Sequence, residues 1–261
     1  MKQYFEGNEY HTPKDTPRFL MDKLLFNTRV ILMTRVVAQL LDSRSLALKN
    51  KYNSQEWAEA SINIMKSIEG CGGRFHITGF DELRRCKKPI VMVSNHMSTL
   101  ETMVFPGLIV PFMEFNFVVK HSLATHPVFG PVMMARSPIT VMRTNPREDL
   151  QKVMVEGVKL LEEGSSIVIF PQSTRTVEFI PEEFNSLGVK LAKKAGVQVL
   201  PIAIKTDFWR NGKYLRDLGP IDRSKDIYIS FGEPIDIEGN GKEEHKKILE
   251  FIGSNISEWS K

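Results

Sequence analysis

The sequence has few of the features that mark disulfide frameworks, metal centres or membrane spans. Its 261 residues include two cysteines, Cys71 and Cys86, which match no disulfide or metal-binding pattern and are typical of a reduced, cytosolic setting. The first 17 residues are polar and lack an apolar centre, so no signal peptide is expected. The longest apolar stretch, residues 103–119, is interrupted by two prolines and a glutamate, whereas a spanning helix needs about 20 continuous apolar residues.

Several common catalytic motifs are also missing. The sequence contains no Gly-x-Ser-x-Gly turn, which an esterase serine would need. It contains neither a Gly-x-x-x-x-Gly-Lys-Ser/Thr phosphate loop nor a His-Glu-x-x-His zinc helix. A serine hydrolase of the elbow type is therefore disfavoured, and so are nucleotide hydrolysis on a phosphate loop and zinc-dependent proteolysis.

Basic residues are concentrated near the N-terminus. The chain has 35 Lys and Arg against 31 Asp and Glu, and residues 18–51 alone hold seven basic and two acidic side chains. Because this segment is also rich in Leu, Val, Ile and Met, it favours an anionic membrane surface over nucleic acid as a partner. The charges do not fall on one clean helical face, however, so a core-packed helix with solvated charges is an equal alternative.

The N-terminal region predicts two helices. Residues 1–17 are expected to form a loose arm, and residues 18–42 and 53–69 are expected to form helices. The second helix ends at a pair of glycines, Gly72 and Gly73. This pattern indicates a two-helix hairpin. We therefore divide the chain into an N-terminal arm and membrane-docking hairpin, residues 1–72, and a second domain, residues 73–261.

From residue 74 onward, short apolar runs alternate with helical patterns. Strands are expected at 74–79, 90–94, 115–119, 139–142, 166–170, 197–204 and 227–231, and helices from Ser98 to Pro106, at 145–163, 184–195 and 243–259. This alternation predicts an α/β fold with a largely parallel sheet flanked by helices. Ligands of such sheets bind at the carboxyl ends of the strands.

One cluster of candidate residues follows the strand at 90–94. Asn95 and His96 come directly after it, and Glu101 lies five positions beyond His96. A lone histidine is often structural, and Ser98 with Glu101 has the spacing of a helix capping box. The two roles are compatible, because a carboxylate near a helix N-terminus stays ionised and can accept a hydrogen bond from His96 Nδ1. Nε2 would then be free to act as a general base.

A second cluster follows the strand at 166–170. Arg175 lies in this loop, and Arg143 ends the strand at 139–142. Either could be an ordinary surface arginine, but the guanidinium group also suits a phosphate or carboxylate. Ser173 and Thr174 could add hydroxyl and backbone donors around an anion, whereas Lys120 is better explained as a solvated charge. The two clusters suggest one site built from two loops.

Together these residues resemble the 1-acyl-sn-glycerol-3-phosphate acyltransferase or glycerophospholipid acyltransferase superfamily. Its motifs have counterparts here in order: Asn-His-x-x-x-x-Asp at 95–101 with Glu101 for Asp, a block from Lys120 to Arg143, Phe-Pro-Gln-Ser-Thr-Arg-Thr at 170–176 for the family's Phe-Pro-Glu-Gly-Thr-Arg-Ser, and an apolar strand with a central proline at 199–204. The resemblance covers about residues 74–236. One block alone would be weak, but four in order are fairly specific.

The resemblance implies transfer of a fatty acyl group from an acyl thioester, either acyl-CoA or acyl-ACP, to the hydroxyl of a lysophospholipid. The expected acceptor is 1-acyl-sn-glycerol-3-phosphate, which would give phosphatidic acid. His96 would be the catalytic base and Glu101 would orient it. Substrate contacts are expected from Asn95, Lys120, Arg143, Gln172, Ser173, Thr174 and Arg175. No metal and no cofactor other than the thioester co-substrate is implied.

Two departures from the family pattern leave alternatives open. Gln172 stands where the family has a glutamate, and Ser173 where it has a glycine. A different acceptor is therefore possible, such as glycerol-3-phosphate, another lysophospholipid or an aminolipid, as is a non-catalytic lipid-binding module of the same fold. The hairpin lies where family members carry a helical membrane anchor. This implies a peripheral or monotopic protein on the cytoplasmic face of the membrane, with no nucleic-acid partner.

Overall fold

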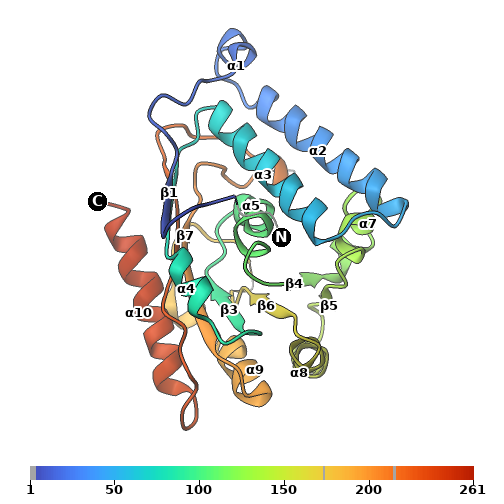
Figure 1. Cartoon of the computed structure of the whole chain (residues 1–261), viewed down its shortest axis with the longest axis vertical. Helices are drawn as coiled ribbons and strands as arrows, with labels where there is room; N and C mark the ends of the chain where they lie inside the picture. Colours follow the sequence, from blue (N-terminus) through green and yellow to red (C-terminus); the bar gives the residue numbers. More distant parts are fainter. Residues whose placement is uncertain (1–3, 173, 214–215) are drawn as a thin grey trace.

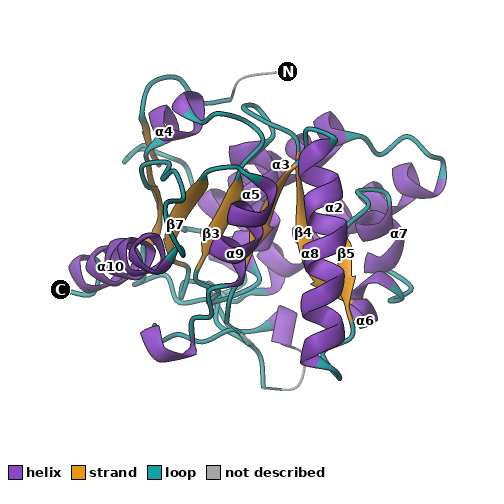
Figure 2. Ribbon diagram, turned by 90° about the horizontal axis from the view of Figure 1, so that it is seen from below, coloured by secondary structure: helices purple, strands orange, loops and turns teal. Residues whose placement is uncertain are grey.

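A computed structural model describes residues 4–172, 174–213 and 216–261 of the chain. Within these residues, eight strands form one sheet in the order β1-β2-β8-β7-β3-β6-β4-β5 (Figure 2). The strands are β1 (Glu9–His11), β2 (Phe75–Thr78), β3 (Val91–Ser94), β4 (Phe115–Lys120), β5 (Ile139–Val141), β6 (Ser166–Ile169), β7 (Val199–Lys205) and β8 (Ile227–Phe231). The five strands from β7 to β5 are mutually parallel, while β8 runs antiparallel to β7.

Helices cover both faces of this sheet (Figure 1). They are α1 (Leu20–Leu24), α2 (Val30–Leu48), α3 (Ser54–Gly70), α4 (Phe80–Arg85), α5 (Leu100–Ile109), α6 (His121–Ala124), α7 (Phe129–Met134), α8 (Pro146–Glu162), α9 (Leu187–Ala195) and α10 (Lys242–Glu258), with 3-10 turns at Pro181–Glu183 and Arg216–Leu218. The predicted α/β fold with a largely parallel sheet is confirmed.

The core is divided into two layers by the sheet. Met92 of β3 packs with residues of α2, α3 and α5, whereas Val91 and Val93, its neighbours in the strand, pack with residues of α8, α9 and α10. Successive strand residues point to opposite faces, so a strand that is covered on both sides must be apolar throughout. This explains the unbroken apolar run that precedes His96.

The parallel strands bring distant loops to the same edge. β3 pairs with β6 through Val93 and Ile169, so the loops that begin at Asn95 and Phe170 leave the sheet side by side. β7 lies on the other side of β3, and its last residue is Lys205. The carboxyl ends of β3, β6 and β7 therefore surround one site.

Two predictions for the N-terminal region are wrong. The expected helix at 18–42 is broken between α1 and α2, because Phe26 and Asn27 adopt the left-handed conformation, with φ of 53° and 58°. Residues 1–17 are not a loose arm throughout, because β1 pairs antiparallel with β2. The helices α2 and α3 do pack against each other (Figure 1). Among the described residues, no helix combines the length and hydropathy required to cross a bilayer.

The expected end of a helix at Pro106 is also wrong, because α5 continues through this residue to Ile109. Proline normally disrupts a helix by removing an N–H donor and crowding the preceding turn. Here Ser61 of α3 inserts its hydroxyl group beside the proline, donating to the carbonyl of Val104 and accepting from the N–H of Gly107, each at 2.8 Å. The neighbouring helix thus supplies a hydrogen-bond acceptor for the N–H that directly follows the proline.

Candidate active site

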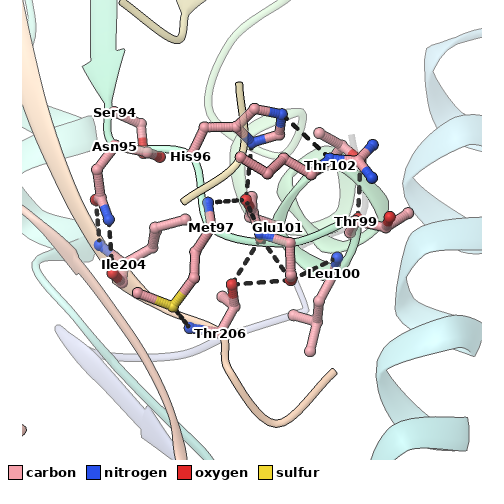
Figure 3. Close-up of polar contacts among 12 residues, drawn as sticks. Ser94, Asn95, His96, Met97, Thr99, Leu100, Glu101, Thr102, Ile204 and Thr206 are labelled. Carbon is pink, nitrogen blue, oxygen red and sulfur yellow. Dashed lines mark hydrogen bonds and ion pairs between the residues drawn. The ribbon is translucent and has the colours of Figure 1, made fainter. Parts of the chain in front are cut away.

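His96 and Glu101 form a hydrogen-bonded pair at the carboxyl end of β3 (Figure 3). Nδ1 of His96 lies 2.8 Å from Oε1 of Glu101. A carboxylate can only accept, so this contact places the imidazole proton on Nδ1 and leaves the lone pair on Nε2. The imidazole is thereby oriented for proton abstraction at Nε2.

Glu101 is fully buried and its carboxylate accepts five hydrogen bonds. Besides His96, the donors are the backbone N–H groups of Met97 and Ser98 and the hydroxyl groups of Ser98 and Thr206. Burial opposes ionisation, but the hydrogen bond and charge of His96 and the other donors outweigh it, so the pKa of Glu101 is lowered from 4.5. The carboxylate therefore serves both as a cap at the start of α5 and as the partner of the imidazole.

Two buried amides hold the loop of His96 in place. The Asn95 side chain accepts from the N–H of Ile204 and donates to its carbonyl, both at 2.9 Å, and so ties β3 to β7. Gln172, 4% exposed, accepts the N–H of His96 at 2.7 Å and donates to Oγ1 of Thr176 at 2.7 Å. Both amides make their contacts within the protein, and their expected role in substrate binding stays a prediction.

Aromatic rings line one side of the imidazole. The ring of Phe170 stacks on His96 with centroids 4.2 Å apart. Phe105 and Phe117 stack in turn on Phe170, each at 6.1 Å. An apolar wall beside the base excludes water from that side.

Arg175 lies next to Nε2 of His96, the ring nitrogen that does not contact Glu101. Its Nε is 3.4 Å from His96 Nε2, a long and weak hydrogen bond, and its Nη1 donates to Asp217 at 2.6 Å. Asp217 also accepts from the hydroxyl of Thr99 at 2.7 Å. Burial opposes ionisation of Asp217, but the hydrogen bonds from Thr99 and Arg175 and the charge of Arg175 lower its pKa below the usual 3.8.

Asp217 is a site residue that sequence reasoning missed. It lies in the short turn Arg216–Leu218, outside every regular strand–helix junction that the sequence marks. No motif or periodicity points to it. Its proximity to Arg175 follows only from the path of the chain after β7.

The remaining residues that are expected to bind substrate lie farther from the imidazole or outside the residues that the structure describes. Lys120 ends β4 and Arg143 follows β5, and both are exposed. β5 is three places from β3 in the sheet, or about 14 Å at the usual strand spacing. Thr174 is exposed, and Ser173 lies outside the described residues.

The described part of the chain holds no group of three or more His, Cys, Asp or Glu side chains placed to bind a metal ion. The sequence-based expectation of a reaction without metal or resident cofactor stays a prediction. The groups at hand are a base, a carboxylate that orients it and a guanidinium, which together can remove a proton from a hydroxyl beside an anion.

The structure thus combines a mainly parallel sheet with a histidine–carboxylate pair and an arginine at the ends of its strands. The chain belongs to the acyltransferase family, whose model matches residues 74–205. It is an acyltransferase.

The comparisons with individual proteins agree. The chain is 29% identical over 187 residues to the 1-acyl-sn-glycerol-3-phosphate acyltransferase of Pseudomonas aeruginosa, covering 72% of this chain and 68% of that one. It is 28% identical over 186 residues to a protein of the same name from Chlamydomonas reinhardtii, covering 71% of this chain and 52% of that one. The crystal structure of the 1-acyl-sn-glycerophosphate acyltransferase PlsC from Thermotoga maritima has the same fold, with a TM-score of 0.70, 16% identity and coverage of 92% and 97%.

Proposed function

We propose that the chain transfers a fatty acyl group from an acyl thioester to the free hydroxyl of 1-acyl-sn-glycerol-3-phosphate, giving phosphatidic acid. The observation that carries this proposal is the contact of His96 Nδ1 with the buried Glu101 carboxylate at 2.8 Å, with Arg175 beside Nε2. The names of the relatives support the choice of acceptor.

In the proposed reaction, the acceptor hydroxyl occupies the place beside His96 Nε2 that the weak Arg175 contact now fills. Nε2 takes the hydroxyl proton as the oxygen attacks the thioester carbon. The C–O bond forms and the C–S bond breaks, and the proton passes from Nε2 to the departing sulfur, so that a free thiol leaves. Glu101 stabilises the transient imidazolium through Nδ1.

Arg175 is proposed to hold the acceptor phosphate next to the base. Its guanidinium is fixed by Asp217 at 2.6 Å, which limits the side-chain entropy lost on ligand binding. Arg143 and Lys120, near the ends of neighbouring strands β5 and β4, are proposed to attract the headgroup from farther away. Arg175 is therefore the arginine with the larger expected role.

This division of roles predicts that Arg175→Gln raises the Michaelis constant for lysophosphatidic acid about tenfold or more, because a charge-assisted hydrogen bond contributes about 1.5–3 kcal/mol. Arg143→Gln should have the same effect to a smaller extent. Initial rates with lysophosphatidic acid and with monoacylglycerol, which lacks the phosphate, provide the measurement.

The control is Arg85→Gln, on α4, whose side chain is 64% exposed. It should behave as the wild type. An unchanged Michaelis constant for lysophosphatidic acid in Arg175→Gln, or an equal penalty with monoacylglycerol, would show that Arg175 does not bind the phosphate. If the protein uses another acceptor that carries a phosphate, Arg175→Gln should raise the Michaelis constant for that acceptor instead.

The acceptor is a lipid, and we propose that the surface of α1 and α2 docks on an anionic membrane. Nine of the fifteen large hydrophobic side chains that are exposed among the described residues lie on this surface: Leu20, Met21, Leu24, Leu25, Phe26, Val30, Val37, Leu41 and Leu48. Exposed apolar patches of this kind mark interaction sites. Basic side chains on the same segment, including Lys23 and Arg29, suit anionic headgroups.

Replacing one of these apolar side chains should weaken membrane binding. Leu24→Ser or Phe26→Ser is expected to reduce binding to vesicles that contain anionic lipid several-fold, since burying such a side chain contributes about 1.5–3 kcal/mol when complete. The matched control is Val155→Ser on α8, because Val155 is 58% exposed and Leu24 59%. Vesicle co-sedimentation measures both. Equal binding by all three variants would contradict the docking surface.

A further inference from the structure

A cleft of about 840 Å³ opens beside the site at the same edge of the sheet. Its walls come from the segment after β6, the end of β7, the start of β8, and the last turns of α10, with Glu178, Lys205, Tyr228, Ser257 and Trp259 among the lining residues. Its volume lies within the range of about 300–1,000 Å³ that is usual for small-molecule sites. None of the steps proposed above uses it.

The cleft is continuous with the loops that hold the base. Met97, which follows His96 directly, lines it. On the other wall, Glu178 accepts a hydrogen bond through its carbonyl from Oγ1 of Thr176, whose own N–H donates to the carbonyl of His96 at 3.0 Å. A ligand in the cleft therefore lies against the same two loops that position the imidazole.

One wall of the cleft belongs to the helical layer opposite α2. α10, which forms one of its walls, packs on β7 in the layer shared with α8 and α9, whereas α2 lies in the layer on the opposite face of the sheet (Figure 1). Another wall runs close to α1, because Ser224 lines the cleft and its neighbour Arg223 donates hydrogen bonds to Asp22 and to the carbonyl of Thr28.

The lining suits a neutral ligand that is partly polar and partly apolar. Three lysines and three carboxylates line the cleft, and Lys205 pairs with Asp207 at 3.0 Å, so that the charges balance. This balance disfavours a polyanion inside the cleft. The rings of Tyr228 and Trp259, stacked 5.2 Å apart, provide an apolar surface, and Ser257 adds a hydroxyl group.

From these observations we infer that the cleft binds the pantetheine arm of the acyl donor, an inference that rests on the proposed thioester-dependent transfer. The arm is uncharged and combines amide groups with a dimethyl-substituted carbon, which matches the lining. Coenzyme A and acyl carrier protein share this arm, and the charged remainder of either carrier stays outside the cleft. After transfer the arm carries the free thiol, formed from the thioester sulfur and the proton delivered by His96.

The test fills the cleft with a bulky side chain. Ser257→Trp changes an exposed residue of α10 that lines the cleft, and the matched control Ser254→Trp changes an exposed serine of the same helix outside the described lining. The dissociation constants of unreactive thioether analogues, S-alkyl coenzyme A and S-alkyl acyl carrier protein, are measured by calorimetry. The Michaelis constants for donor and acceptor are measured alongside.

Ser257→Trp should weaken binding of the analogue about tenfold or more, because a steric clash in a filled site costs about 1–3 kcal/mol. The Michaelis constant for the acceptor should not change, and Ser254→Trp should match the wild type. The two analogues also distinguish coenzyme A from acyl carrier protein as the donor's carrier. The carrier is identified by the analogue that binds to the wild type and binds more weakly to Ser257→Trp.

If Ser257→Trp binds the analogue as tightly as the wild type does, and lipid product still forms, the cleft assignment is overturned and the proposed function stays intact. Weakened binding together with no lipid product from the wild type would instead overturn the proposed function and keep the cleft as a pantetheine site.

Discussion

His96→Ala is expected to lower the rate of acyl transfer by about 10²–10⁴-fold, the usual contribution of a positioned general base. The side chain provides Nε2 as the base, and Glu101 orients the ring through its contact with Nδ1. The variant should stay folded, because Asn95 and Gln172 anchor the loop through contacts that do not involve the imidazole. Circular dichroism and thermal unfolding check the fold, and release of free thiol measures the rate.

The control for this variant is His11→Ala, at an exposed histidine of β1 on the edge of the sheet. It should transfer acyl groups at the wild-type rate. A folded His96→Ala protein with full activity would exclude His96 as the base, and the proposed mechanism would then fail.

Glu101→Gln is expected to reduce both activity and stability. The neutral amide can no longer stabilise an imidazolium, and its NH₂ group meets donors where the carboxylate accepted five hydrogen bonds. A buried donor left unpaired costs about 1–3 kcal/mol, so we expect a loss of this size in the free energy of unfolding. Denaturant titrations and initial rates measure the two effects, with Glu162→Gln, at an exposed position of α8, as the control.

The stability effect should depend on pH in a defined direction. The pKa of Glu101 is lowered in the folded protein, so its stabilising contribution is complete above the ordinary value of 4.5. It is lost as the pH falls through the folded-state pKa, because protonation then removes the charge in both states. The difference between wild type and Glu101→Gln should be constant from pH 6 to 8 and shrink below 4.5. A difference that grows on acidification would contradict this assignment.

The parts of the site that could be predicted are those fixed by local sequence. His96 and Glu101 are five residues apart at a strand–helix junction, so the pair lies within one local segment of the sequence. Arg175 could be placed near them because β3 and β6 are both buried strands of a parallel sheet. The fold class followed from the same alternation of strands and helices.

The parts that could not be predicted depend on contacts between distant segments or on unusual backbone conformations. Asp217 reaches Arg175 from an irregular turn that carries no pattern. The break between α1 and α2 uses left-handed residues that are not glycine, and the passage of α5 through Pro106 depends on a serine supplied by α3. Each of these features is decided by tertiary structure, and none has a periodic signal in the sequence.

The most direct test of the account is mass spectrometry of the lipids formed by purified protein from acyl-CoA or acyl-ACP and a panel of acceptors: lysophosphatidic acid, glycerol-3-phosphate, another lysophospholipid and an aminolipid. The account predicts phosphatidic acid from lysophosphatidic acid with at least one donor, formed at least about a hundredfold more slowly when His96→Ala replaces the wild type. Product from every acceptor except lysophosphatidic acid, or equal phosphatidic acid from both proteins, would contradict it.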